Sequence, residues 1–228
     1  MKHIRAICLD LDDTLWDLGP VIGRAEQALQ AWFAQRYPRV TQRYGIEDIR
    51  ELRRQIEARH PGQGHDLALL RQATFTQVAR DCGYPESMGE AAFAAFQQLR
   101  NQVTLYADVR PGLARLARRL PLVALTNGNA DLDVIGLRHY FCAVLGAADL
   151  GVAKPDPRAF EAVCARLSLR PGDIVHAGDH PQHDVAGARA MGMTAVWVNR
   201  GHHAWPDGMA PAEHVVRELG QLVRLVGA

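Results

Sequence analysis

Short apolar runs alternate with helical patterns through the second half of the chain, and this alternation restricts the fold more than any other feature. The runs expected to be strands are residues 122–126, 143–146, 174–177 and 195–198. The segments expected to be helices are residues 111–120, 132–140, 157–167 and 184–191. Strands and helices that alternate at this spacing are joined by right-handed crossovers. The pattern therefore predicts a parallel sheet that is covered by helices on both faces.

A further apolar run, residues 4–9 (IRAICL), opens the chain and ends abruptly in acidic residues. A buried parallel strand ends in this way where its carboxyl end opens into a crevice. The residues that follow contain no convincing strand. Four helical segments are expected there, separated by proline and glycine breakers: residues 21–37, 46–60, 65–82 and 86–106. We therefore predict an α/β protein with a Rossmann-like core, residues 1–17 and 107–228, and an inserted all-helical cap domain, residues 18–106.

Composition excludes several classes of partner. The 228 residues include 26 Lys and Arg against 25 Asp and Glu, so a nucleic-acid partner is not expected. No apolar run approaches the roughly 20 residues that span a bilayer, so no membrane partner is expected either. The four cysteines are widely spaced, which predicts reduced core residues of a cytoplasmic protein. A monomer and a homodimer are equally compatible with the sequence.

Polar residues follow the predicted strands where each of them ends. They are Asp10 and Asp12 after the first strand, Thr126 and Asn127 after the second, Lys154 in the loop after the third, and Asp179 and Asp184 after the fourth. In open parallel sheets, ligands bind outside the carboxyl ends of the strands. These residues are therefore expected to share one site.

The residue types of this site suit phosphoryl chemistry. Carboxylates within a few ångströms of one another need a positive partner, and Mg²⁺ is the expected cation because it prefers oxygen ligands. Asp10 and Asp12 are two residues apart on an extended segment, so both can face one reacting centre. One can attack while the other transfers a proton. Lys154 and the donors at Thr126 and Asn127 would neutralise phosphoryl oxygens.

Four stretches, taken together and in this order, resemble the motifs of the haloacid dehalogenase-like (HAD) hydrolase superfamily. They are DLDDT at residues 10–14, TN at 126–127, the lysine before a proline at 154–155, and GDHPQHD at 178–184. The resemblance extends over essentially the whole chain. It implies that residues 18–106 form the helical cap that this superfamily inserts after its first motif.

The resemblance also implies a role for each residue. Asp10 would be the nucleophile that becomes an aspartyl-phosphate, and Asp12 the general acid and base. Thr126 and Asn127 would hold the phosphoryl oxygens, and Lys154 would screen the charge between nucleophile and phosphate.

For Mg²⁺, the resemblance implies three ligands: the carboxylates of Asp10 and Asp179, and the backbone carbonyl of Asp12. Asp184 would act through metal-bound water or by orienting its neighbours.

The carboxylate at position 12 favours a phosphatase over a 2-haloacid dehalogenase, because a leaving halide needs no proton. Phosphomutases of the superfamily usually carry Gly-Val where this chain has Asp13-Thr14. The expected activity is that of a Mg²⁺-dependent phosphomonoesterase acting on a small phosphorylated metabolite. The alternatives are a phosphomutase, a dehalogenase and a non-catalytic module that senses phosphate.

A closer resemblance is to bacterial phosphatases of FMN and of the ribitylaminouracil phosphate of riboflavin synthesis. Related branches act on nucleotides and on sugar phosphates. The stretch at residues 121–141, the GDxxxxD spacing, and His65-Asp66 followed by Arg71 carry this resemblance. His65 and Arg71 are candidates for cap specificity, with a solvated helix face as the alternative. His180 departs from the usual small or acidic residue at its position.

Other notable residues have simpler interpretations. Asp13 and Asp17 are predicted to serve in turns or helix caps, and Asp156 is expected to cap a helix. Trp16 is predicted to be a packing anchor or a stacking surface. His176 lies in a predicted core strand, without the tetrahedral ligand pattern that would indicate zinc.

Overall fold

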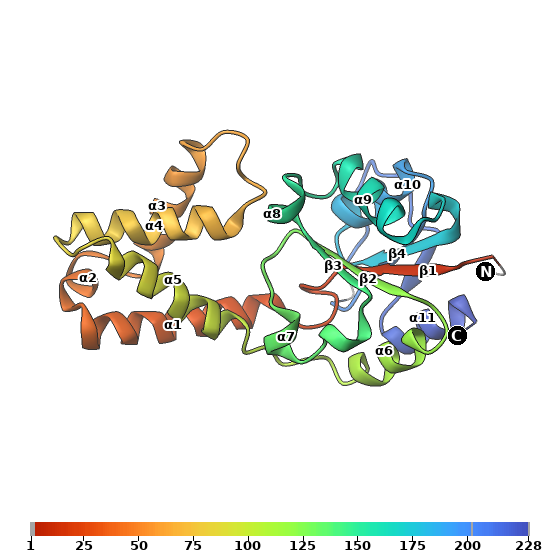
Figure 1. Ribbon diagram of the computed structural model, residues 1–228, viewed down its shortest axis with the longest axis horizontal. Helices are drawn as coiled ribbons and strands as arrows, with labels where there is room; N and C mark the ends of the chain where they lie inside the picture. Colours follow the sequence, from red (N-terminus) through yellow and green to blue (C-terminus); the bar gives the residue numbers. More distant parts are fainter. Residues whose placement is uncertain (1–2, 202, 228) are drawn as a thin grey trace. The chain divides into compact units, whose positions relative to one another are not determined.

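The protein, represented by a computed structural model, consists of two compact units (Figure 1). The structure describes residues 3–201 and 203–227. The core unit contains the chain up to Asp17 and again from Thr104 onward, and the cap unit contains Leu18–Val103.

A six-stranded parallel sheet forms the centre of the core and confirms the predicted α/β class. Its strands are β1 (Ala6–Leu9), β2 (Leu122–Thr126), β3 (Ala143–Gly146), β4 (Ile174–Gly178), β5 (Thr194–Val198) and β6 (His214–Val216). They lie in the order β3-β2-β1-β4-β5-β6. Because β1 is central, Cys8 pairs with Val123 on one side and with His176 on the other. The carboxyl end of β1 is therefore flanked by those of β2 and β4.

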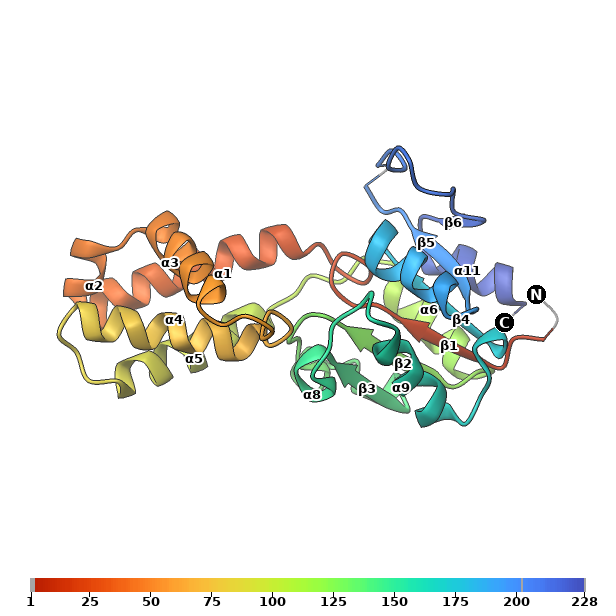
Figure 2. The same ribbon diagram turned by 90° about the horizontal axis from the view of Figure 1, so that it is seen from above.

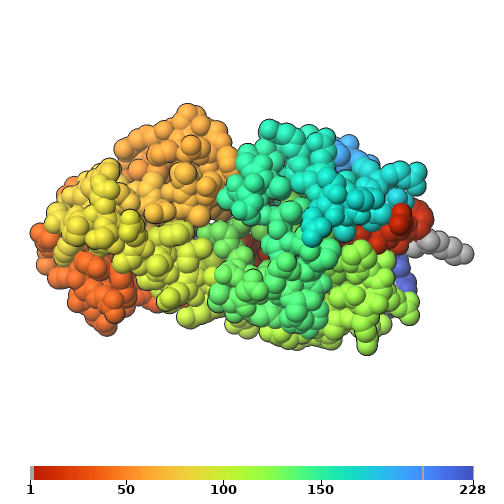
Figure 3. Space-filling view, in the orientation of Figure 1, coloured from red at the N-terminus to blue at the C-terminus, as the bar shows by residue number. Residues whose placement is uncertain are grey.

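Helices cover both faces of this sheet, as Figure 1 shows. The helices α9 (Pro157–Leu167) and α10 (Gly187–Ala190) lie on one face, and α6 (Val109–Ala117) and α11 (Leu219–Val226) on the other. Two short helices, α7 (Leu132–Ile135) and α8 (Ala147–Leu150), follow β2 and β3. In the space-filling view of Figure 3, green and teal residues cover β1, whose red shows mainly at its N-terminal end. The apolar β1 strand is thus buried on both faces, as a run without polar alternation requires.

The cap is a helical unit with its own apolar core (Figure 2). It consists of α1 (Leu18–Arg36), α2 (Pro38–Arg43), α3 (Ile46–Ala58), α4 (Leu67–Asp81) and α5 (Ser87–Arg100). The ring of Phe75 lies 6.2 Å from that of Phe33 and 6.3 Å from that of Phe96, so α1, α4 and α5 meet at a cluster of aromatic rings.

Several elements differ from the predicted ones. The last cap helix ends at Arg100 instead of residue 106, because Leu105 pairs as an isolated bridge with Trp16. The helix expected at residues 132–140 is divided at Gly136, whose φ of 77° ends α7. The sequence analysis missed four short or terminal elements: α2, α8, β6 and α11.

The prediction that all four cysteines are core residues was wrong for Cys142. Cys8 and Cys82 are buried, but Cys142 is exposed at the start of the edge strand β3. Its thiol donates to the carbonyl of Leu122, 3.1 Å away, which gives a polar partner to a side chain outside the core. Within the described ranges, no helix is both long and apolar enough to cross a bilayer.

Candidate active site

The first predicted site residue, Asp10, lies immediately beyond β1. Its N–H donates to the carbonyl of Ala177 in β4 at 3.0 Å, which continues the sheet pairing by one residue. The side chain is almost completely buried, with 6% of the residue exposed. The sheet therefore fixes the Asp10 backbone, and the carboxylate occupies a poorly solvated position.

Lys154 forms ion pairs with two of the buried carboxylates at this edge. Its ammonium Nζ lies 2.5 Å from Oδ1 of Asp10 and 2.6 Å from Oδ1 of Asp184. Each of the three side chains has at most 9% of its surface exposed. A buried ion pair of this kind depends on both partners, because removing one leaves an uncompensated charge.

Asn127 fixes the backbone on which Lys154 lies. Its Oδ1 accepts the Lys154 N–H at 2.8 Å, and its Nδ2 donates to the Lys154 carbonyl at 2.9 Å. The neighbouring Thr126 is buried at the end of β2, where its hydroxyl accepts the N–H of Gly128 at 2.9 Å. The loop after β2 is thus bonded to the loop that carries the lysine.

Asp184 is held from three directions. Its Oδ1 lies 2.9 Å from Nε2 of His176 as well as beside Lys154, and its Oδ2 accepts the His180 N–H at 3.0 Å. Gly178 leaves the space for this carboxylate, since a Cβ there would come within 2.3–2.7 Å of its atoms. The backbone of β4 therefore requires glycine at this position.

Asp179 completes the acidic group. Its Oδ1 lies 3.4 Å from the Thr14 hydroxyl, and its carbonyl accepts the indole N–H of Trp197 at 2.7 Å. Ligand oxygens of Asp10, Asp179 and Asp184 all lie within 4.8 Å of one another. The structure thus brings the predicted carboxylates of β1 and β4 together.

The balance of charge in this group favours a cation. Burial raises the pKa of Asp10 to about 7, although Lys154 opposes the shift. Burial, Asp10 and Asp184 raise the pKa of Asp179 to about 8. For Asp184, burial acts to raise the pKa, but Lys154 and His176 outweigh it and hold the pKa below its usual range. Burial acts to lower the pKa of Lys154, but the two carboxylates outweigh it and raise this pKa.

These shifts mean that one ammonium does not offset three carboxylates at neutral pH. The donor atoms are all carboxylate oxygens, the ligand type that hard divalent cations such as Mg²⁺ prefer. The residues therefore fit the predicted Mg²⁺. Asp10 and Asp179 have fewer protein partners than Asp184, so their carboxylates are the ones suited to bind it.

Asp12, the predicted proton-transfer residue, lies in the tight turn that follows β1. Its Oδ1 accepts the indole N–H of Trp16 at 2.9 Å. Trp16 is completely buried, as the packing interpretation requires, but the sequence analysis did not foresee this polar contact. Asp13 lies in the turn with a φ of 59°, and the predicted turn role is confirmed.

Two more residues that bond to the site region could not be assigned roles from the sequence. His176, a predicted core residue, is buried in β4 and contacts Asp184, which lies eight residues further along the chain, after the turn that follows β4. Arg200 follows β5; its Nε donates to the carbonyl of Thr14 at 3.1 Å, and its Nη1 lies 2.7 Å from Oδ1 of Asp108. The sequence signal for Arg200 was a charged residue two positions after the end of a strand.

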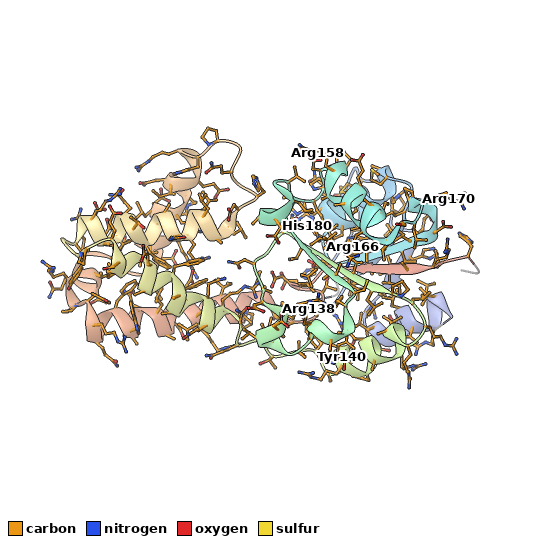
Figure 4. All side chains as sticks on the ribbon, viewed as in Figure 1. Arg138, Tyr140, Arg158, Arg166, Arg170 and His180 are labelled. Atoms are coloured by element: carbon orange, nitrogen blue, oxygen red, sulfur yellow. The ribbon has the colours of Figure 1, made fainter. Side chains whose placement is uncertain are left out.

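The histidines after β4 form a stacked pair. The rings of His180 and His183 lie 3.8 Å apart and 10° from parallel, and Nδ1 of His180 accepts two backbone N–H groups at the start of the next helical turn. Figure 4 labels His180 at the carboxyl-end edge of the core sheet and Arg170 at the opposite edge. The structure thus gives His180 a helix-capping role.

The helix cap predicted at Asp156 is confirmed, because its side chain accepts a hydrogen bond from the Arg158 N–H at the start of α9.

The two cap candidates lie on different parts of the cap. His65 is in the loop before α4, where Asp66 caps the helix. Arg71 is within α4, and its guanidinium lies 3.8 Å from the centre of the Phe96 ring. Burial lowers the pKa of Arg71 to about 10. Arg71 is partly buried and packs against the Phe96 ring; its contact with substrate stays a prediction, as does that of His65.

Comparison with known proteins agrees with this architecture. The haloacid dehalogenase-like hydrolase family matches residues 4–192. The 5-amino-6-(5-phospho-D-ribitylamino)uracil phosphatase YigB of Escherichia coli is 33% identical, over 99% of this chain and 98% of that protein. A phosphoglycolate phosphatase of Chromobacterium violaceum is 31% identical, over 89% of this chain and 88% of that protein.

A solved structure is similar over the same length. The crystal structure of a 2-haloacid dehalogenase from Pseudomonas syringae pv. tomato superposes with a TM-score of 0.92 at 36% identity and covers 98% of both chains. The matched family model spans most of the chain, and the phosphatase relative spans nearly all of it. The protein is therefore an enzyme of the haloacid dehalogenase-like hydrolase family.

Proposed function

We propose that this hydrolase is a Mg²⁺-dependent phosphomonoesterase that acts through a phospho-aspartate on Asp10. The observation that carries the proposal is the combination of a buried Asp10, ion-paired to Lys154, with a second carboxylate two residues further on at Asp12. A nucleophilic carboxylate alone would serve several reactions of the family. A second acid in the same turn is needed where an alkoxide leaves, because an alkoxide requires a proton.

The chain's own residues would divide the reaction as follows. An oxygen of Asp10 attacks phosphorus while Asp12 gives a proton to the departing alcohol; Asp12 then takes a proton from the water that hydrolyses the aspartyl-phosphate. Lys154, Thr126 and Asn127 bind the phosphoryl oxygens, and Asp184 holds Lys154 in place. Mg²⁺, held by Asp10, Asp179 and the Asp12 carbonyl, would add positive charge beside the phosphoryl oxygens.

The relatives support a proposal for the substrate class. The two phosphatases named above act on a phosphorylated ribitylaminouracil and on phosphoglycolate, both small metabolites. We propose a substrate of this kind, with ribitylaminouracil phosphate and FMN as the first candidates and nucleotides and sugar phosphates next. His65 and Arg71 are the proposed cap contributions to this choice. The four cysteines are all free, which supports a reducing cytoplasmic location, and we propose that a monomer or homodimer works without nucleic acid or membrane.

The test is phosphate release from p-nitrophenyl phosphate, followed by a screen of flavin, nucleotide and sugar phosphates compared by kcat/KM. We expect activity with Mg²⁺, its loss in excess EDTA, and its loss in Asp10→Asn. The matched control is Asp13→Asn, which removes a carboxylate from the same turn and keeps a residue type that tolerates positive φ. Full activity of Asp10→Asn, or full activity in EDTA, would overturn the proposal. Release of isomeric sugar phosphates without free phosphate would identify a mutase instead.

A dehalogenase is the second candidate because of the similarity to the Pseudomonas syringae structure. The two reactions share an attacking aspartate and differ in their leaving groups. Halide release from 2-chloropropionate separates them: we expect none above background. Halide release that exceeds phosphate release would assign the dehalogenase reaction.

A further inference from the structure

The turn between β1 and the cap folds back so that residue 16 returns to residue 12. The N–H groups of Thr14 and Leu15 both donate to the carbonyl of Leu11, at 3.3 and 2.8 Å. Asp13 takes the positive φ that the reversal requires. The backbones of Asp12 and Trp16 then pair as an isolated bridge. The indole of Trp16 is therefore brought to the Asp12 carboxylate by the turn itself.

Trp16 is held in this position from the other side as well. Its backbone pairs with Leu105, and the Tyr106 N–H donates to the carbonyl of Leu15 at 3.1 Å. The Arg200 guanidinium lies 4.5 Å from the centre of the Tyr106 ring and bonds to the Thr14 carbonyl. A completely buried ring between two paired segments has little freedom to turn. The indole N–H is thus a fixed donor.

The chemistry of this donor limits what it can do. An indole N–H donates a hydrogen bond but neither accepts one nor exchanges its proton in catalysis. A fixed N–H at Oδ1 therefore restricts rotation of the Asp12 carboxyl group without itself taking part in proton transfer.

We propose that Trp16 is a positioning residue for the general acid: its indole N–H holds Oδ1 of Asp12 and so fixes the orientation of the carboxyl group that gives a proton to the leaving group. This inference rests on the phosphatase function proposed above. In the first step, an oxygen of Asp10 bonds to phosphorus, the bond from phosphorus to the ester oxygen breaks, and a proton passes from the Asp12 carboxyl group to that oxygen. In the second, water bonds to phosphorus and gives a proton to the Asp12 carboxylate, and the bond from phosphorus to Asp10 breaks, releasing inorganic phosphate.

The dependence on the leaving group distinguishes positioning of an acid from general support of the fold. A p-nitrophenolate ion leaves readily without a proton, whereas departure of an unsubstituted phenolate depends more strongly on protonation. The ratio kcat/KM reports the steps through formation of the aspartyl-phosphate, provided that this step is irreversible, so it isolates protonation of the leaving group. We therefore compare p-nitrophenyl phosphate with phenyl phosphate, two esters of nearly the same shape.

Trp16→Phe removes the indole N–H and keeps an aromatic ring. General acid catalysis contributes about 10²–10⁴-fold, so partial loss of its alignment should lower kcat/KM for phenyl phosphate about tenfold more than for p-nitrophenyl phosphate. The matched control is Trp205→Phe, which removes an indole bond of 3.2 Å to the Met209 carbonyl elsewhere in the core. We expect the control to keep the wild-type ratio of kcat/KM for phenyl phosphate to kcat/KM for p-nitrophenyl phosphate.

Equal reductions for the two esters, or no reduction, would overturn the positioning role while leaving the phosphatase function intact. No phosphate release from either ester by the wild type would overturn the proposed function itself, and the inference with it.

A measurement without turnover covers the case in which Trp16→Phe does not fold. The four tryptophans each give an indole signal in a ¹⁵N–¹H spectrum, and each can be assigned by substituting one tryptophan. Asp12→Asn should shift the Trp16 indole signal and leave that of Trp205 in place. An unchanged Trp16 signal would overturn the inference.

Discussion

The core and the cap differ in how they place charged side chains. In the core, the Lys154 side chain is 3% exposed and touches two carboxylates that are almost as buried. In the cap, the pair of Arg80 with Glu86 has more than half of both side chains exposed, and the interior is mainly aromatic and aliphatic, with Arg100 as a buried charged residue. Burial of charge is costly unless every partner is present. The core gathers buried charges at the proposed active site, whereas the cap interior is held together mainly by apolar packing.

The largest test of this contrast is removal of the buried ammonium. Lys154→Met leaves Asp10 and Asp184 without their shared cation, which should cost about 3–5 kcal/mol of unfolding free energy. Because Lys154 is a proposed donor to the phosphoryl group, its loss should also lower kcat about 10²–10³-fold. Urea denaturation and phosphate release measure the two effects. Wild-type stability would show that the Lys154 ammonium does not stabilise the buried carboxylates of Asp10 and Asp184.

The second test asks whether the apolar core of the cap stabilises only the cap and not the core unit. Phe33→Ala removes a completely buried ring from the aromatic cluster and should cost about 3–5 kcal/mol. Hydrogen exchange should increase in α1, α4 and α5 and stay at wild-type levels in β1, β2 and β4. The reciprocal variant is Phe160→Ala, which opens the core beneath the sheet and should increase exchange there. Equal loss of protection in both units after either substitution would contradict two separate packing units.

An intermediate case is Asp108, a partly buried carboxylate of the core. Burial acts to raise its pKa, but the bonds from Arg200 and from the Leu219 N–H outweigh burial and lower the pKa below 3.8. Because the folded pKa is below the unfolded one, the ionised group stabilises the protein above about pH 4, and this contribution is lost as the pH falls through the folded pKa.

Asp108→Asn should therefore cost about 1.5–3 kcal/mol at pH 7, the range for hydrogen bonds to charged groups. The difference from wild type should shrink as the pH is lowered below 4. Urea denaturation at several pH values measures it. A difference that does not change with pH would show that shape, and not charge, accounts for the effect.

The smallest effect is expected on the cap surface. Glu86→Ala breaks the exposed pair with Arg80 and should change the unfolding free energy by less than about 1 kcal/mol, falling further in high salt. Thermal unfolding at low and high ionic strength measures this. A cost close to that of Lys154→Met would remove the contrast between the two units.

The order of elements was predictable because it depends on patterns that are local in sequence. Apolar runs of four to six residues separated by helical periods gave β1 to β5, and breakers such as Pro38 marked the helices of the cap. The ends were less predictable. Arg100 ends α5 because Leu105 pairs with Trp16, a contact across almost ninety residues that no local pattern contains.

The sequence by itself determined which residue types gather at the carboxyl ends of β1, β2 and β4, because the alternation of strands and helices, which predicts parallel strands, is a local pattern. Only the tertiary structure decided how they are paired. It placed the Lys154 ammonium between Asp10 and Asp184, and it gave His176 a carboxylate partner. It also made Trp16, a packing residue, a hydrogen-bond donor to Asp12. The physical reason is that a hydrogen bond or ion pair forms only when its donor and acceptor lie about 3 Å apart, to within a few tenths of an ångström. The packing of the whole core sets these distances.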